Sequence, residues 1–309
     1  RSESIGQKYL ILKNNTDRTV KTLDIQSGDL VEISTTAKRY NLGETVSITG
    51  TSEPNKNTTI WIKDGNKKTV IYDIISSNGN GDLVYEFVAN DAFPTGTYSV
   101  TVKQESESDA TFFGINQDPS KGVITLMEKT NYMLNSKAIL SVVGPESTNI
   151  TISILNNADE VQTTDTITTS NYGKGQYVID LAGFGQGVFR AVAVYQNIQD
   201  SVKFSVGIET GAGEISLSTT KESYHPGDSI LIIGQTGSNA RLTISLHDPS
   251  ENLITKTDIF SDSTGSFSTN DIGIPSSGIT GDWKIIAYSP GSVLQFTETV
   301  HVVDPSENG

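Results

Sequence analysis

The chain has 309 residues and a formal net charge of −14, and it contains no cysteine. Without cysteine, a disulfide framework, a thiolate zinc site and a thiol nucleophile are all excluded. The negative charge repels a phosphate backbone, so we expect no nucleic-acid partner and an attraction for cations.

Residues 1–27 contain strand-like stretches within "QKYLILKNNTDRTVKTLDI". We interpret them either as the end of a preceding domain or as an added strand. The chain starts at Arg1 with no signal-peptide pattern, so we expect a processed product or an excerpt of a longer protein. No apolar run approaches the length of a membrane span, and no direct span is expected in this chain.

One short phrase occurs three times at a constant spacing. Its tyrosines, Tyr40, Tyr132 and Tyr224, are separated by 132 − 40 = 92 and 224 − 132 = 92. The third residue after each tyrosine is Gly or Asn, which accept a positive φ, and the next residue has a side-chain oxygen that can bond nearby N–H groups. These pairs are Gly43/Glu44, Asn135/Ser136 and Gly227/Asp228. We interpret the phrase as a tight turn before a core strand, not as a catalytic site.

Alternating strands follow each turn at the same spacing. Period-two alternation is typical of a strand with one face in a core and one toward water. The inward set is Thr58/Ile60/Ile62, Ile150/Ile152/Ile154 and Leu242/Ile244/Leu246, and the outward set is Thr59/Trp61, Thr151/Ser153 and Thr243/Ser245. A glycine followed two residues later by an aromatic begins a further strand at Gly96/Tyr98, Gly187/Phe189 and Gly281/Trp283. Closing strands are predicted near Phe112–Ile115, Phe204–Ile208 and Phe296–Val303.

The repeat predicts an all-β protein of three tandem immunoglobulin-like β-sandwich domains. We place the domains at 28–119, 120–211 and 212–303, followed by a tail at 304–309. Two turn signals, "SNGNGD" at Ser77–Asp82 and "SDSTGSF" at Ser261–Phe267, predict hairpins. The connections "NQDPSK" and "ETGAG" are short, and short linkers restrict rotation, so we expect an elongated, semi-rigid rod.

The sequence contains little that indicates chemistry, and we predict that the chain is not an enzyme. Its three histidines, His225, His247 and His301, show no metal-ligand spacing. Asn78, Asn80 and Asp82 offer oxygen ligands at alternate positions, but an N-G turn explains them better than a calcium loop. No cofactor is predicted with a defined site. Divalent cations such as Ca²⁺ are the candidate ligands, at positions that one sequence does not locate.

Asparagine sequons are the most informative surface motif. They occur at Asn14, Asn57 and Asn149, and the last two are separated by the same interval as the tyrosines, so they occupy the same place in successive domains. We predict N-linked glycans at these three sites if the chain is extracellular. Trp61, on the outward side of its strand, is interpreted as packing against a neighbouring domain rather than stacking on a sugar.

The repeated phrase resembles the opening turn of a family of modules in archaeal cell-surface proteins. "YNLGETVSITG" and "YHPGDSILIIG", each followed by a T-I-x-I or T-I-x-L strand, are similar to the immunoglobulin-like domains of surface-layer proteins from ammonia-oxidising archaea. Asn135 and Ser136 in the second domain depart from the Gly-Asp of that motif. The resemblance implies export to the cell surface or envelope, N-glycosylation, cation attraction and assembly with other copies into a lattice.

Two functions therefore arise from the sequence. The first is a structural cell-surface protein, part of a surface-layer lattice whose acidic surface attracts cations. The alternative is an adhesin or a carbohydrate-binding stalk of a cell-surface or secreted protein. Accessory modules of a secreted enzyme are a third interpretation.

Overall fold

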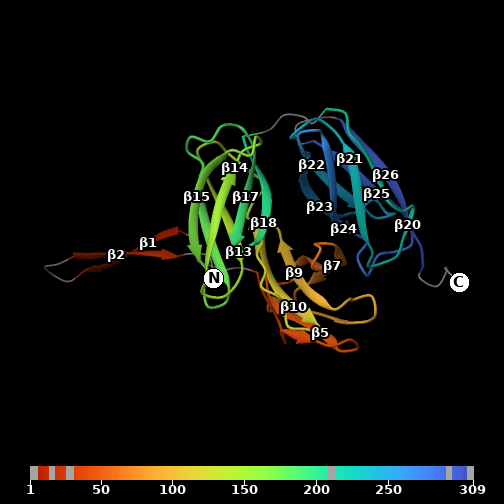
Figure 1. Cartoon of the computed structure of the whole chain (residues 1–309), viewed down its shortest axis with the longest axis horizontal. Helices are drawn as coiled ribbons and strands as arrows, with labels where there is room; N and C mark the ends of the chain where they lie inside the picture. Colours follow the sequence, from red (N-terminus) through yellow and green to blue (C-terminus); the bar gives the residue numbers. More distant parts are fainter. Residues whose placement is uncertain (1–5, 14–17, 26–30, 208–212, 290–293, 305–309) are drawn as a thin grey trace.

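The computed structural model describes residues 6–13, 18–25, 31–207, 213–289 and 294–304, and its regular elements are strands (Figure 1). They form one two-stranded sheet, three three-stranded sheets and three five-stranded sheets. The predicted all-β fold with three repeated β-sandwiches is confirmed. Among the described residues, no helix is long and apolar enough to cross a membrane.

Sandwich 1 shows the arrangement that all three share. Its strands are β3 (Glu32–Thr35), β4 (Arg39–Tyr40), β5 (Thr45–Thr51), β6 (Asn57–Lys63), β7 (Thr69–Ser76), β8 (Asp82–Val88), β9 (Gly96–Gln104) and β10 (Glu107–Ile115). One sheet has the order β3-β5-β8 and the other the order β4-β10-β9-β6-β7. The short β4 pairs in parallel with β10, while the other neighbours are antiparallel, which is an immunoglobulin-like topology.

Sandwiches 2 and 3 repeat this order strand for strand. Sandwich 2 consists of β11 (Ile124–Met127), β12 (Asn131–Tyr132), β13 (Lys137–Val143), β14 (Asn149–Leu155), β15 (Val161–Thr168), β16 (Lys174–Asp180), β17 (Gly187–Tyr195) and β18 (Ile198–Val206). Sandwich 3 consists of β19 (Ser216–Thr219), β20 (Ser223–Tyr224), β21 (Ser229–Gln235), β22 (Arg241–His247), β23 (Leu253–Phe260), β24 (Ser266–Gly273), β25 (Gly281–Tyr288) and β26 (Gln295–Val302). The predicted closing strands are therefore present; Ile208 lies outside the described residues.

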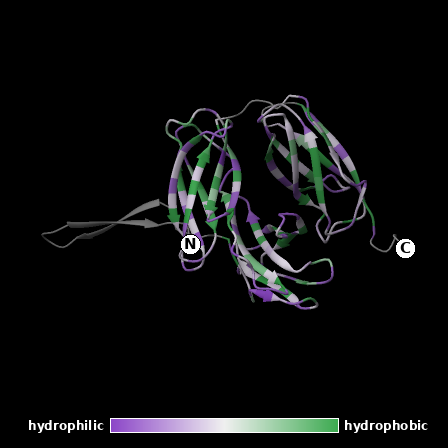
Figure 2. Ribbon diagram, in the orientation of Figure 1, coloured by the Kyte–Doolittle hydropathy of each residue, from purple (hydrophilic) through white to green (hydrophobic). Residues whose placement is uncertain are grey.

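Each sandwich encloses a hydrophobic core of its own. The three clusters of buried residues span 31–115, 123–206 and 215–302, and no cluster shares a member with another. The whole inward set predicted from β6, β14 and β22 has 0% exposure. Apolar Ile150, Ile152 and Ile154 alternate with polar residues along β14. Hydrophobic and hydrophilic segments alternate along many strands of the three sandwiches (Figure 2). Burial of one face of strands such as β14 thus explains why apolar residues recur in them with a period of two.

The repeated tyrosine lies where the chain leaves the smaller sheet and enters the larger one. Gly43, Asn135 and Gly227 have φ values of 87°, 57° and 91°, so the predicted positive-φ turn is confirmed. The hydroxyl of Tyr132 accepts a hydrogen bond from the N–H of Lys129 at 2.9 Å, and Tyr40 and Tyr224 bond Ala37 and Lys221 in the same way. Each tyrosine therefore fills the core and also fixes the bend between two strands.

Replacing Tyr132 by phenylalanine should destabilise sandwich 2 by about 1 kcal/mol, because it leaves the Lys129 N–H without this acceptor while keeping the ring. The matched control is Tyr172→Phe, since Tyr172 is 79% exposed. Denaturant unfolding of both variants checks the effect. Equal free energies of unfolding would contradict the role assigned to the hydroxyl.

Both predicted hairpin turns are present as turns, but the strands that flank each of them do not pair with one another. Residues 77–81 connect β7 to β8, and residues 261–265 connect β23 to β24. In both cases the two strands belong to different sheets. The local turn signal was interpreted correctly, but an N-G or T-G turn does not determine whether its flanking strands pair. In a sandwich, the same turn carries the chain across the core.

The expected rod is also wrong. Sandwich 1 contacts sandwich 3 directly, through residues as far apart in sequence as Trp61 and Asp271. Figure 1 shows sandwich 2 in green, sandwich 3 in blue and sandwich 1 in orange, arranged as a triangle rather than in a line. The short linker at 116–121 does not prevent this, because polar and aromatic side chains on the outer face of sandwich 1 find partners on both neighbours. The other predicted linker, "ETGAG", falls largely outside the described residues.

Residues 1–27 contribute an antiparallel hairpin of β1 (Gly6–Lys13) and β2 (Arg18–Ile25). It forms a two-stranded sheet separate from the sheets of the three sandwiches (Figure 1).

Candidate functional site

The outer face of the five-stranded sheet of sandwich 1 is the contact surface for sandwich 3. Trp61 donates its indole N–H to the backbone carbonyl of Asp271 at 2.9 Å. Lys63, two residues further along β6, places its Nζ 2.6 Å from Oδ1 of the same aspartate. Trp61 thus packs against a neighbouring domain, as its outward position predicted.

A buried carboxylate strengthens this contact on the adjacent strand β7. Asp73 is 4% exposed, and it accepts hydrogen bonds from both the backbone N–H and the hydroxyl of Ser276 in sandwich 3, at 3.1 and 2.7 Å. Hydrogen bonds to an ionised group are about twice as strong as neutral ones. Asp73 therefore contributes two hydrogen bonds to a buried carboxylate at the contact between sandwiches 1 and 3.

Tyr72 makes the same contact sensitive to high pH. Its side chain has 0% exposure, and a Cβ added at Gly273 of sandwich 3 would lie only 2.8 Å from its ring. Burial raises the pKa of Tyr72 to about 12, and the nearby Thr255 of sandwich 3 offsets only part of this rise. Among the described residues, none forms a hydrogen bond of ordinary geometry with the Tyr72 hydroxyl. Between about pH 10 and 12, the phenol is thus neutral only while the two sandwiches are closed.

We expect the contact to weaken as pH rises from about 10 to 12. A freed phenol ionises with an ordinary pKa near 10, whereas the closed state retains the proton, so alkaline pH favours opening. Below pH 10 the contribution of Tyr72 to the stability of the contact is fully present. Small-angle X-ray scattering at pH 9 and pH 11 measures the change, and Tyr72→Phe should keep the contact closed at both values. An equal response of the wild type and this variant would contradict the assignment.

Two aspartates at corresponding positions link sandwich 2 to sandwich 1. Asp109 accepts the N–H of Ile33 at 2.8 Å and lies 2.7 Å from Nζ of Lys174 in sandwich 2. Asp200 accepts the N–H of Thr125 at 2.8 Å and lies 2.5 Å from Nζ of Lys67 in sandwich 1. Sequence reasoning missed both residues. The sequence signal that could have revealed them is an aspartate at the same position in the last two strands of two domains, β9–β10 and β17–β18.

Sandwich 3 also contacts sandwich 2, and this explains a second departure from the predicted pattern. Thr243 and Ser245 were expected to face water, but they are only 6% and 4% exposed. Asp258 accepts hydrogen bonds from Thr243 at 2.6 Å and from Thr130 of sandwich 2 at 2.6 Å. The outer face of β22 is therefore partly covered by this contact.

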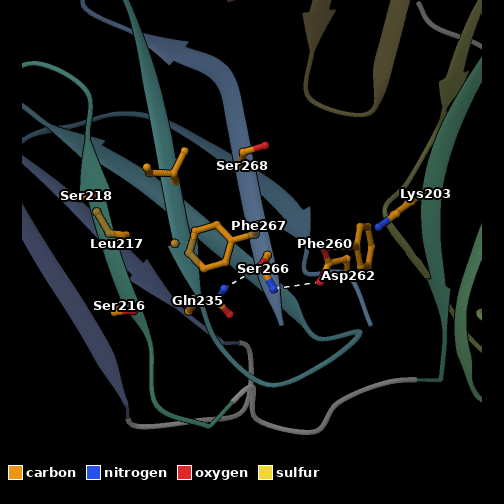
Figure 3. Close-up of a pocket in the computed structure, with 12 residues that line it drawn as sticks. Lys203, Ser216, Leu217, Ser218, Gln235, Phe260, Asp262, Ser266, Phe267 and Ser268 are labelled. Carbon is orange, nitrogen blue, oxygen red and sulfur yellow. Dashed lines mark hydrogen bonds between the residues drawn. The ribbon is translucent and has the colours of Figure 1, made fainter. Parts of the chain in front are cut away.

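A groove with a volume of about 740 Å³ lies between sandwiches 2 and 3 (Figure 3). Lys203 of β18 extends toward the ring of Phe260, and the facing wall is the outer side of the small sheet of sandwich 3, including Ser216, Ser218 and Gln235. The carboxylate of Asp262 accepts the N–H of Ser266 at 3.0 Å within a turn. Hydrogen bonding to the side chain of Thr264 lowers the pKa of Asp262. Its role in the turn is thus structural.

The predicted glycosylation sites are placed as follows. Asn57 and Asn149 are both exposed and begin the equivalent strands β6 and β14. Each side-chain carbonyl accepts a hydroxyl at 2.7 Å, from Ser76 and Thr168 respectively. Asn57 also borders a cavity of about 380 Å³ between sandwiches 1 and 3. Asn14 lies outside the described residues.

The histidines and the candidate calcium loop are separate from one another. His301 bonds Asp282 at 2.5 Å, His225 lies 3.8 Å from Asp228, and His247 bonds Ser245 at 3.1 Å. The side-chain carbonyl of Asn78 accepts the N–H groups of Asn80 and Asp82, as in a plain turn. Among the described residues, no group of three or more acidic or histidine side chains is placed to hold a metal ion.

No protein-family model and no curated protein matches the chain. Among solved structures, a tetra-tandem repeat from the extending region of a large adhesion protein is 18% identical, with a TM-score of 0.26, and the match covers 96% of this chain and 82% of that one. Trypsin-activated alpha-2-macroglobulin from Escherichia coli is 11% identical, with a TM-score of 0.26, and the match covers 96% of this chain and 26% of that one. The chain thus spans about a quarter of that macroglobulin's length. Because both identities and both TM-scores are low, we base the function on the geometry of the chain itself.

Proposed function

We propose that the chain is a spacing segment in the stalk of an extracellular cell-surface adhesion protein, which is the alternative function that the sequence suggested. The observation that carries the proposal is the threefold repetition of one sandwich, each copy with a separate core. Independent cores let a chain resist tension one domain at a time. This function requires no catalytic site.

The contacts between the sandwiches would give such a spacer a shorter, folded-back form and a longer, extended form. They combine ion pairs and hydrogen bonds, such as Lys63–Asp271 and Lys174–Asp109, with a few aromatic side chains such as Tyr72, whereas each sandwich is held by a large buried apolar core. A partly exposed ion pair such as Lys63–Asp271 contributes about 0–1 kcal/mol, and hydrogen bonds to a buried carboxylate such as Asp73 about 1.5–3 kcal/mol each, both far less than a core. Tension along the chain would therefore separate the sandwiches before it unfolds any of them.

Single-molecule force spectroscopy on the chain, held at its two ends, tests this proposal. We expect an early extension at low force, followed by three unfolding steps of similar length. The three cores span nearly equal stretches of chain, 31–115, 123–206 and 215–302. At about 3.5 Å per extended residue, each step should measure roughly 25–30 nm. A single cooperative step would contradict the proposal.

Membership of a surface-layer lattice is the second candidate, and the net charge of −14 favours it because divalent cations could bridge acidic copies. Electron microscopy of the protein after incubation with Ca²⁺ distinguishes the two functions. Two-dimensional sheets would support the lattice, and persistent single molecules at every Ca²⁺ concentration would support the stalk.

An extracellular location also makes the sequons usable. We propose N-linked glycans on Asn14, Asn57 and Asn149 of the protein purified from its native cells. Mass spectrometry of glycopeptides measures their occupancy. Unmodified asparagine at all three sites would remove the glycan part of the proposal and leave the spacer function to the force measurement.

A further inference from the structure

The β1–β2 hairpin has the same backbone register as the hairpin that closes each sandwich. In β9–β10, β17–β18 and β25–β26, the first residue is a glycine paired with the last residue, which is isoleucine or valine: Gly96 with Ile115, Gly187 with Val206 and Gly281 with Val302. In β1–β2, Gly6 is likewise paired with Ile25. All four hairpins thus begin with a glycine that is paired with a final isoleucine or valine.

The position of the hairpin in the chain also matches. A closing hairpin ends shortly before the tyrosine turn of the next sandwich, at Ile115 before Tyr132 and at Val206 before Tyr224. The β1–β2 hairpin ends at Ile25, and Tyr40 follows it after an interval only slightly shorter than the other two. One difference is that Lys8 stands where Tyr98 and its equivalents stand, and the aromatic residue follows one place later, at Tyr9.

In each sandwich, the closing hairpin has a strand on both sides. The first strand of the hairpin pairs with an antiparallel strand, β6, β14 or β22, and the second pairs with the short parallel strand that carries the tyrosine. Among the described strands, β1 and β2 pair only with each other. A lone two-stranded hairpin is marginally stable in water, so these two strands need further partners.

We propose that β1–β2 is the closing hairpin of a fourth sandwich, whose other strands are supplied by chain that precedes it. The length required follows from the three complete copies. The first strand begins at Glu32, Ile124 or Ser216, and the closing hairpin of the same copy begins at Gly96, Gly187 or Gly281. A preceding segment as long as these nearly equal intervals should contain a tyrosine turn and a strand equivalent to β6. The inference does not depend on the proposed spacer function.

Hydrogen exchange of the backbone amides tests the proposal on two chains: residues 1–309, and the same residues extended by what the gene encodes before Arg1. We expect the amides of β1 and β2 to exchange at least about 100-fold more slowly in the extended chain, because stable pairing protects them. The amides of sandwiches 1–3 should not change. Equal exchange in the two chains would overturn the proposal. So would the finding that the mature protein begins at Arg1.

A pair of variants in the extended chain separates specific pairing from general ordering. The register places Leu23 at the position of Phe113, Phe204 and Val300, which all have 0% exposure. It places Thr22 at the position of Phe112, Lys203 and Thr299, none of which is buried. Leu23→Asp should abolish the slow exchange, and Thr22→Asp should leave it within a few-fold. Equal effects would contradict the assignment. Slow exchange in residues 1–309 that depends on concentration would instead indicate pairing with a second copy and would also overturn it.

Discussion

Alanine in place of Gly173 should destabilise sandwich 2 by about 2–4 kcal/mol. Gly173 lies in the turn that carries the chain from one sheet to the other, with φ of 75°, and an added Cβ would lie 2.3 Å from the carbonyl oxygen of Gly144. The substitution thus combines an unfavourable φ with a clash against backbone that cannot move freely. Calorimetry or denaturant unfolding should show a lower stability for one of the three transitions.

Gly183 provides a matched control in the same sandwich. Its φ is 84°, but nothing lies within 4 Å of its added Cβ. Gly183→Ala therefore carries only the cost of the positive φ, about 1 kcal/mol. If both variants lose the same stability, the close approach to Gly144 does not matter. The equivalents Gly81 and Gly265 would face Ser52 and Thr236 at 2.4 and 2.1 Å, so the same result is expected in sandwiches 1 and 3.

Replacement of Asp73 by alanine should open the contact between sandwiches 1 and 3. The variant removes both hydrogen bonds to Ser276, and a hydrogen bond to a charged group contributes about 1.5–3 kcal/mol. The radius of gyration should rise as sandwich 3 separates from sandwich 1, while the three sandwiches stay folded. Small-angle scattering combined with circular dichroism measures both quantities.

Two further variants make this result specific. Asp159→Ala removes the same charge from an exposed ion pair with Arg190, where Asp159 is 74% exposed, and it should leave the radius of gyration unchanged. Ser276→Ala removes one donor from the opposite side and should open the contact to a smaller extent. If Asp73→Ala only lowers the stability of sandwich 1 and Ser276→Ala has no effect, Asp73 acts within its own sandwich.

Features set by local pattern could be predicted from the sequence. The positive φ at Asn135 follows from its place in the turn phrase, and the burial of Ile152 follows from strict alternation in its strand. The constant repeat interval transfers each of these inferences from one domain to the next. The fold could therefore be predicted from this one sequence, without the sequence of a related protein.

Features set by contacts between domains could not be predicted. Asp271 and Trp61 lie in different domains, far apart in the sequence. Asp271 lies where the register of β24 with β21 is irregular, but nothing in either strand's own sequence indicates the other as its partner. Asp73 resembles any polar residue in an edge strand until Ser276 covers it. The expected rod failed for this reason: linker length limits how domains move but does not reveal which outer faces attract one another.

Small-angle X-ray scattering of residues 31–304 at neutral pH tests most directly the claim that sandwich 1 contacts both of its neighbours. Three sandwiches of about 13 Å radius of gyration each, with neighbouring centres about 31 Å apart, give roughly 22 Å for the whole if they form a triangle and roughly 28 Å if they lie in a line. We predict the smaller value. The larger value would contradict the folded-back arrangement and restore the extended rod.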